Sequence, residues 1–200
     1  MTPAFSNSAR RKAILGFSLV ELVTSLAILM ILSAIAIPTL MRAYRSYVLS
    51  DIASRFSGTA KLTRFEAIRK NTQISFRLQQ AGTNWNVWVD SNGNGTPDSG
   101  EPQVVLTGLV VPLPSGSVPS SAPISAANGS ATLSVLSGGN TSVTYDGRGA
   151  IYYGPNPTAV YVFYFGNTSI PNFGSRAVVL LPSGIVQVWT SGTGTWQRLN

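Results

Sequence analysis

The chain has 200 residues, of which 44% are hydrophobic and 10% are charged, and its formal net charge at pH 7 is +7. This length and apolar content fit one modest domain with an appendage. Disorder is not indicated, because few residues are charged and β-branched residues are abundant after residue 70. The chain has neither cysteine nor histidine, which excludes disulfides, Cys/His zinc sites and catalysis by a thiol or an imidazole. We therefore expect no enzyme.

The positive charge is concentrated in the first 77 residues. Three basic residues occupy positions 10–12, and eight more lie between residues 42 and 77, where only Asp51 and Glu66 oppose them. From residue 78 onward three arginines face four acidic residues, so this part of the chain is close to neutral. A broad basic surface for nucleic acid is therefore not expected there.

An almost uninterrupted apolar run extends from Phe17 to Met41. About 20 apolar residues cross a bilayer core as a helix, so the run is long enough for a membrane span. The basic residues before it predict a cytoplasmic amino terminus, although Arg42 and Arg45 on the far side weaken that bias.

A secretory signal peptide, cleaved at the small-residue triplet 34–36, is an alternative interpretation of the same run. Two features oppose it, because the run exceeds the roughly 7 to 15 apolar residues of a signal-peptide core and contains the carboxylate of Glu21. A carboxylate inside a membrane helix costs about 2.5 to 3.5 kcal/mol, so it is normally paired and functional unless it lies near enough to the interface to stay hydrated.

The segment from Gly16 to Leu22, Gly-Phe-Ser-Leu-Val-Glu-Leu, resembles the processing site of type IV prepilins and of type II secretion pseudopilins. In those families a membrane aspartyl peptidase, the prepilin peptidase, cuts after the glycine and methylates the new terminal amine. The resemblance implies cleavage between Gly16 and Phe17. Glu21 then becomes the fifth residue of the mature chain and Pro38 the twenty-second, where pilins commonly carry a proline.

The resemblance also implies how the subunit assembles. The carboxylate of Glu21 would pair with the terminal amine of a neighbouring subunit's Phe17 when the subunit leaves lipid for the filament core. Pro38 removes a backbone donor and allows local bending or melting of the helix.

After Met41 the helical pattern continues to about Lys70. One apolar stripe, with intervals of three and four residues, is expected to cover the sheet of a head domain. Its members are Leu49, Ile52, Ala53, Phe56, Ala60, Thr63 and Ala67. A second stripe of Leu62, Phe65 and Ile68 is either a contact with another subunit or a face buried in the same head.

From residue 72 the apolar period changes to two, which predicts strands, beginning with a hairpin of residues 74–78 and 85–89. Further strands are expected at residues 104–111, 131–136, 142–145, 159–165, 176–181 and 185–190. The Pro-, Ser-, Ala- and Gly-rich stretch 112–130 is expected to be a long loop.

We therefore expect an α+β, pilin-like fold, in which a long N-terminal transmembrane and filament helix packs on an antiparallel β-sheet head. The expected organisation is a leader at 1–16, a transmembrane and polymerisation helix at 17–41, its soluble continuation at 42–71 and a β-rich head at 72–200.

Four segments of the second half resemble the FimT/GspH group of minor pilins and pseudopilins. They are the helix end at 60–71, the hairpin strand at 85–90, Tyr-Asp-Gly-Arg-Gly at 145–149 and the late strand at 182–188. In some relatives a basic carboxy-terminal segment contributes to DNA capture. The tail of this chain, residues 195–200, carries a single arginine, Arg198.

Residues 90–101 match the EF-hand loop pattern, with oxygen ligands at positions 1, 3 and 5, glycine at 6 and an acid at 12. The candidate Ca²⁺ ligands are Asp90, Asn92, Asn94, the carbonyl of Thr96, Asp98 through a water, and Glu101. Strands are expected to flank the loop, so it is not an EF-hand proper. The alternative is a polar hairpin connection in which Asn and Gly supply the turns.

The expected function is that of a structural minor pilin-like subunit of a type IV pilus or a related filament. The alternatives are a type II secretion pseudopilin of the GspH kind and a pilus-tip subunit that binds DNA during uptake. The expected location is the bacterial inner membrane, with a periplasmic head, and then the pilus or pseudopilus. Expected partners are other pilin or pseudopilin subunits, the prepilin peptidase, an inner-membrane assembly platform and, before assembly, membrane lipid. No cofactor is expected to be required, and Ca²⁺ is the one candidate ligand.

Overall fold

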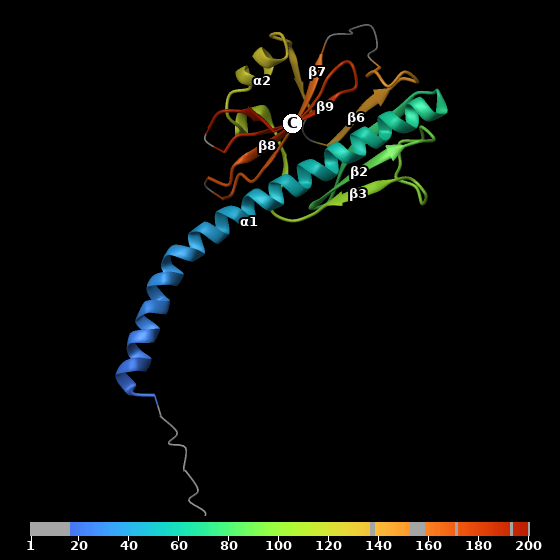
Figure 1. The fold of residues 1–200 in the computed structure, drawn as a ribbon. Helices are drawn as coiled ribbons and strands as arrows, with labels where there is room; N and C mark the ends of the chain where they lie inside the picture. Colours follow the sequence, from blue (N-terminus) through green and yellow to red (C-terminus); the bar gives the residue numbers. More distant parts are fainter. Residues whose placement is uncertain (1–16, 137–138, 153–158, 171, 193, 200) are drawn as a thin grey trace, which may run out of the picture. The chain divides into compact units, whose positions relative to one another are not determined.

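A computed structural model describes residues 17–200 except 137–138, 153–158, 171, 193 and 200. The leader, and with it the expected cleavage residue Gly16, lies outside the described residues. One long helix, α1 (Leu19–Lys70), precedes the strands of a head (Figure 1). The chain divides at Met41 and Arg42 into two compact units, so α1 contributes to both.

Helix α1 begins directly after a capping serine. The backbone N–H of Glu21 donates to the hydroxyl oxygen of Ser18 at 3.2 Å, and the N–H of Leu22 donates to the Ser18 carbonyl at 3.1 Å. Ser-x-x-Glu is the capping-box pattern, and a carboxylate in the first turn is favoured by the helix dipole. Ser18 and Glu21 therefore set the start of the helix immediately downstream of Phe17.

From Phe17 onward, the first unit exposes all of its large apolar side chains. Each such side chain from Phe17 to Met41 is at least 54% exposed. By length and composition, α1 is able to cross a membrane. Pro38 lies inside the helix, and the hydroxyl of the following Thr39 donates to the carbonyl of Ile35 at 3.3 Å. This side-chain donor acts in the turn where the proline supplies no N–H.

The second part of α1 is buried along the predicted stripe, which is therefore confirmed. Its buried members include Leu49, Ile52, Ala53, Phe56, Ala60, Thr63 and Ala67. On another side of the helix Leu62, Phe65 and Ile68 are 37%, 60% and 45% exposed. The head therefore covers α1 on one side, and the second stripe is open to solvent.

Two sheets form the head. The first, with all neighbours antiparallel, contains in order β3 (Gln103–Leu106), β2 (Asn84–Asp90), β1 (Ile74–Ala81) and β6 (Asn140–Tyr145). The second contains in order β10 (Gln197–Arg198), β9 (Val186–Thr190), β8 (Ser175–Leu180), β7 (Val160–Gly166) and β4 (Val111–Leu113), while β5 (Leu133–Val135) pairs parallel to β7. The predicted hairpin is confirmed as β1 and β2. The pilin-like α+β fold is confirmed as well.

The main core joins α1 to both sheets through Phe56, which is 0% exposed. Its ring centroid lies 4.8 Å from that of Phe76 in β1, and 4.6 Å and 4.8 Å from those of Phe163 and Phe165 in β7. Aromatic pairs at these separations contribute about 0.5–1.5 kcal/mol each beyond their buried area. One helix residue therefore contacts both sheets.

A smaller core fills the opposite face of the second sheet. Val162 and Tyr164 alternate along β7 with the phenylalanines of the main core, and they pack with Ile124 of α2 (Ala122–Ala127) and with Trp196. Since successive residues of a strand point to opposite faces, β7 contributes to both cores.

Two expectations about the head are wrong in detail. Residues 112–130 are not a featureless loop, because they include most of β4, the 3₁₀ turn η1 (Ser115–Ser117) and α2, whose Ile124 is 0% exposed. Residues 104–111 are not one strand. The chain turns at Gly108, with φ of 101°, and passes from β3 in the first sheet to β4 in the second.

Phe56→Ala is expected to destabilise the head by about 3–5 kcal/mol, because it removes a buried ring that touches both sheets. The measurement is urea unfolding of the full chain in a neutral detergent, followed by the fluorescence of its 4 tryptophans. Phe65→Ala, on the exposed side of the same helix, is the matched control and should change the unfolding free energy by no more than about 0.5 kcal/mol. Equal effects of the two changes would show that α1 is not held by this cluster.

Candidate functional site

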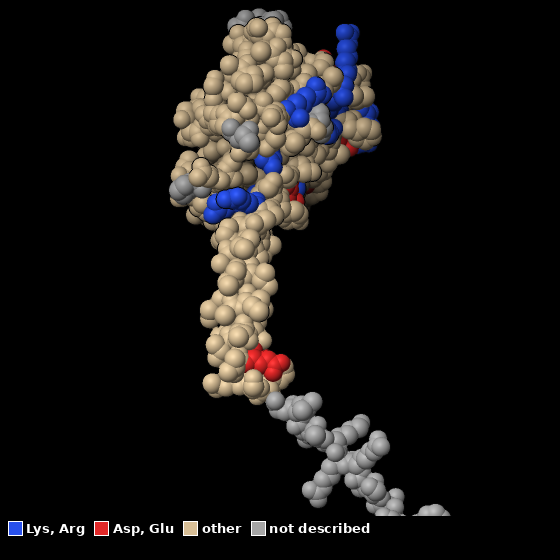
Figure 2. All heavy atoms as spheres, turned by 60° about the vertical axis from the view of Figure 1, so that its left-hand side comes forward, with Lys and Arg blue, Asp and Glu red and all other residues tan. Residues whose placement is uncertain are grey.

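The expected processing and assembly residues lie around the start of α1. Phe17 is 78% exposed and precedes the helix, and Glu21 lies exposed in the first helical turn. Glu21 is the only ionisable side chain between Phe17 and Met41. Figure 2 shows one red acidic group on an otherwise tan segment.

A carboxylate at this place has a favourable electrostatic effect. The amino end of a helix carries a partial positive charge, which disfavours a cation such as a free terminal amine and favours an anion. Glu21 therefore stabilises the first turn of the helix. The capping role was visible in the sequence as Ser-x-x-Glu before an apolar run, but the sequence-based interpretation did not use it.

Three of the segments that resemble the FimT/GspH group meet at the carboxyl end of α1. Arg64 donates from Nε to the carbonyl oxygen of Gly149 at 2.8 Å. A Cβ atom on Gly184 would lie 1.9 Å from that oxygen and 2.7 Å from Arg64 Nε, so a larger residue does not fit without a shift. A Cβ on Gly147 would likewise lie 2.7 Å from Asn71 Oδ1. We call this contact region the glycine junction. Its glycines allow two turns to approach the helix, which is a structural role.

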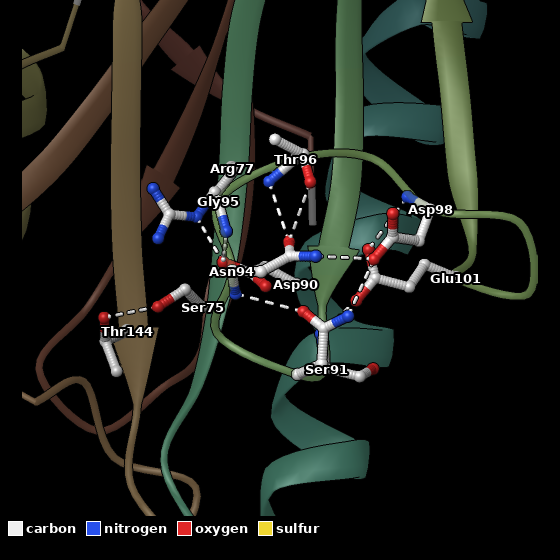
Figure 3. A network of polar contacts seen from close by, with 11 residues as sticks. Ser75, Arg77, Asp90, Ser91, Asn94, Gly95, Thr96, Asp98, Glu101 and Thr144 are labelled. Atoms are coloured by element: carbon white, nitrogen blue, oxygen red, sulfur yellow. Dashed lines mark hydrogen bonds and ion pairs between the residues drawn. The ribbon is translucent and has the colours of Figure 1, made fainter.

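The candidate calcium loop begins where β2 ends. Asp90 is 1% exposed, and its Oδ2 accepts from Arg77 Nε at 2.5 Å and from the N–H of Gly95 at 3.2 Å (Figure 3). Its Oδ1 is buried and has no hydrogen-bond partner among the described residues. The pairing of Arg77 with Asp90 was not foreseen, because it depends on the antiparallel register of β1 and β2.

The two asparagines of the loop turn its backbone and converge on Asp98. Asn92 Oδ1 accepts from the N–H of Asn94 at 3.0 Å, and Asn94 Oδ1 accepts from the N–H of Thr96 at 2.9 Å. The amide nitrogens of Asn92 and Asn94 donate to Asp98 Oδ2 at 2.7 Å and 2.6 Å. These three side chains therefore meet at Asp98 Oδ2, and Figure 3 shows Asn94 beside Asp98.

Glu101 closes the loop. Its Oε1 accepts from the N–H of Ser91 at 2.7 Å, and its Oε2 accepts from the N–H of Asp98 at 3.4 Å. The structure thus gathers the predicted residues of 90–101 in one loop, but its own donors occupy most of their oxygens. Within the described part of the chain, no group of three or more His, Cys, Asp or Glu residues is arranged to hold a metal ion. Calcium binding stays a prediction.

On the face drawn in Figure 2, the charged residues of the head do not form one continuous surface. Figure 2 shows the lysines and arginines of this face in several separate groups. The carboxy-terminal strand β10 contains Arg198, and both of its residues are exposed. The visible face therefore offers no extended basic track of the kind that follows a nucleic-acid backbone.

Two family comparisons match the chain. Residues 11–37 match the prokaryotic N-terminal methylation motif, and residues 53–184 match the family described as type II transport protein GspH. No curated protein and no solved structure matches the chain. The first match includes Gly16, Phe17 and Glu21; the second spans more than half of the chain, including the glycine junction and the loop 90–101.

These matches confirm the resemblance to pilin-like proteins and, within them, to the FimT/GspH group. They also bear on activity, since members of this family are structural subunits, and the expectation of a non-enzyme is confirmed. The chain belongs to the GspH family of type II transport proteins and carries the N-terminal methylation motif of pilin-like subunits.

Proposed function

We propose that the protein is a minor pseudopilin of the GspH kind. In this proposal residues 17–41 insert into the inner membrane, the prepilin peptidase cuts after Gly16, and the subunit then assembles with other pseudopilins on the inner-membrane platform of a type II secretion system. The observation that carries it is the GspH match over residues 53–184 together with the methylation motif at 11–37. The sequence-based interpretation put a type IV pilus first, and the family match favours its secretion alternative.

The exposure of the amino-terminal segment supports assembly through α1. Large apolar side chains that are at least 54% exposed from Phe17 to Met41 require lipid or other subunits around them. When these side chains pass from lipid to the core of a filament, they exchange one apolar environment for another. The hydrophobic effect therefore does not oppose the transfer. The charge of Glu21 does oppose burial unless a cation compensates it.

The terminal amine that cleavage creates at Phe17 is a cation that can compensate the charge of Glu21. It lies close along the chain to Glu21, so both groups reach the filament core together. Pairing between neighbouring subunits would compensate two charges at once and would fix the axial stagger of one helix against the next. Pairing within one subunit is the competing arrangement, and it would leave the stagger unspecified.

The second stripe of α1 supports a lateral contact within the filament. Leu62, Phe65 and Ile68 are exposed apolar residues on one side of a helix whose other side is covered by the head. Apolar and aromatic side chains are enriched at the centres of protein interfaces. We propose that a neighbouring subunit covers this stripe.

Binding of DNA at a filament tip is the remaining alternative. The carboxy-terminal tail contributes only Arg198, and the basic residues on the visible face of the head are separated from one another. Neither observation favours this function.

Calcium binding by residues 90–101 is a second, independent proposal. It is supported by the ligand pattern of the loop and by the buried, unpartnered Oδ1 of Asp90. The amide nitrogens of Asn92 and Asn94, which donate to Asp98, would have to turn away from it for a cation to bind there. A bound cation would compete with Arg77 for Asp90 and would have to replace the hydrogen bonds that Glu101 accepts. Weak affinity is therefore expected.

Glu21→Ala is expected to insert into the membrane and to be cleaved, but to enter the filament about tenfold less than the wild type or worse, because a buried amine would lose its partner. The test complements a deletion strain and measures both secretion of a type II substrate and recovery of the subunit in cross-linked filaments. Thr24→Ala, one turn further along, is the matched control. Normal incorporation of Glu21→Ala refutes the pairing, and a deletion that abolishes pili but leaves secretion intact refutes the pseudopilin proposal.

Titration of the full chain in detergent with CaCl₂ should give a dissociation constant of about 0.1–1 mM, the range of weak extracellular calcium sites. Glu101→Gln should remove the heat of binding, because it removes the expected bidentate ligand. Glu66→Gln, which removes the same charge from a half-buried position paired with Arg69 on α1, should not. If the wild type gives no heat of binding at millimolar Ca²⁺, the calcium proposal is refuted.

A further inference from the structure

A groove of about 620 Å³ lies in the head between α1 and the ends of β8 and β9. Helix α1 contributes Arg42, Arg45, Ser46 and Leu49 to its wall, residues whose spacing of three and four places them on one side of the helix. The opposite wall includes Phe173 and Arg176. Three arginines thus face the groove, and none of the described residues that line it is acidic.

Arg176 is the most unusual of the three, because it is only 7% exposed. Its Nη1 donates to the hydroxyl of Thr190 at 2.6 Å and to the carbonyl of Ser175 at 3.3 Å, and its Nη2 donates to the hydroxyls of Ser46 at 3.0 Å and Ser50 at 3.2 Å. All four acceptors are neutral. Its Nε is buried and has no hydrogen-bond partner among the described residues.

A buried guanidinium normally has a carboxylate beside it, because removing its charge from water is costly. Burial lowers the pKa of Arg176 from its ordinary value, yet arginine stays protonated at neutral pH. Arg176 therefore holds a positive charge in the wall of the groove that the described residues do not neutralise. An anion bound in the groove would supply the missing charge.

The other walls indicate which kind of anion fits. Phe173 and Leu49 are 7% and 1% exposed and give the groove an apolar surface. The guanidinium carbon of Arg45 lies 5.8 Å from the centroid of the Phe173 ring, a cation–π distance. Guanidinium groups and nearby hydroxyls can donate hydrogen bonds to the several oxygens of a phosphate. The apolar surface can pack against a carbon chain attached to that phosphate.

The place of the groove along the chain indicates the source of that phosphate. Arg42 directly follows Met41, the last residue of the apolar run, and Arg45 and Ser46 lie within the next turn or so of the same helix. If residues 17–41 occupy the hydrocarbon core, the next residues of α1 lie in the headgroup layer, among the phosphates of the phospholipids.

We propose that the groove of Arg42, Arg45 and Arg176 binds the phosphate headgroup of one anionic phospholipid. This inference rests on the membrane-inserted state proposed above. The bound lipid would hold the start of the head at the membrane surface before assembly. It would have to leave, or be carried along, when the subunit enters the filament.

Native mass spectrometry of the full chain in a mild neutral detergent, with added phosphatidylglycerol or phosphatidylcholine, tests the proposal. The wild type should retain one phosphatidylglycerol in preference to phosphatidylcholine. Arg42→Gln and Arg45→Gln should each weaken retention by about fivefold, the effect expected for one basic residue near an anionic headgroup. Arg176→Gln should weaken it further. Arg148→Gln removes the same charge from an exposed position in a turn after β6 and should have no effect.

Arg42→Gln is the deciding variant, since Arg42 is exposed and its change does not disturb the core. Equal retention of the two lipids by the wild type, or equal losses in Arg42→Gln and Arg148→Gln, would overturn the proposal. Displacement of the lipid by a short DNA duplex at equal phosphate concentration would overturn it in favour of a nucleic-acid groove. Flotation with phosphatidylcholine vesicles keeps the two claims separate: failure to float counts against membrane insertion, whereas floating without lipid selectivity counts against the groove alone.

Discussion

The contact of Phe56 with Phe76, Phe163 and Phe165 is the interaction on which the rest of the head depends. Through this ring the second part of α1 contacts both sheets, whose own rings Phe76 and Phe163 lie 6.0 Å apart. Because the carboxyl part of α1 is committed to this core, the helix cannot leave the head without unfolding it. The amino-terminal part of the same helix has no such role, and its apolar side chains remain available to lipid or to other subunits.

The charges are distributed in accordance with this division. The apolar run contains Glu21 alone, placed in the first turn, where the helix dipole and a capping serine stabilise it before any partner is present. After the apolar run, arginine first occurs at residue 42. One of the groove arginines, Arg176, comes from a strand far along the chain and is held by hydroxyls of α1. The cationic partner of Glu21 and the anionic partner of the groove are thus both sought outside the subunit, at opposite ends of the apolar run.

Local periodicity predicted the parts of the fold that depend on one element at a time. The buried stripe from Leu49 to Ala67 and the hairpin of β1 and β2 follow from spacings of three to four and of two residues, which the structure retains. The separation of residues 104–111 at Gly108 and the burial of Ile124 in α2 depend on which sheet each segment joins, and no spacing encodes that. The same limit applies to the sites. Glu21 and the loop 90–101 are visible in the sequence as motifs. Other contacts join residues that only the folded chain places side by side: the pair Arg77–Asp90, the pair Arg64–Gly149 and the groove around Arg176.

The central claim is that the helix which builds the core of the head begins, in the mature protein, at a processed and methylated end. Mass spectrometry of the amino-terminal peptide, on protein extracted from the membranes of cells that contain the prepilin peptidase, tests it most directly. The expected result is a chain that starts at Phe17 with an N-methylated amine, and an intact leader when the peptidase is deleted. A mature chain that starts near Ile37 would contradict the claim, because it would identify residues 17–36 as part of a removed signal peptide.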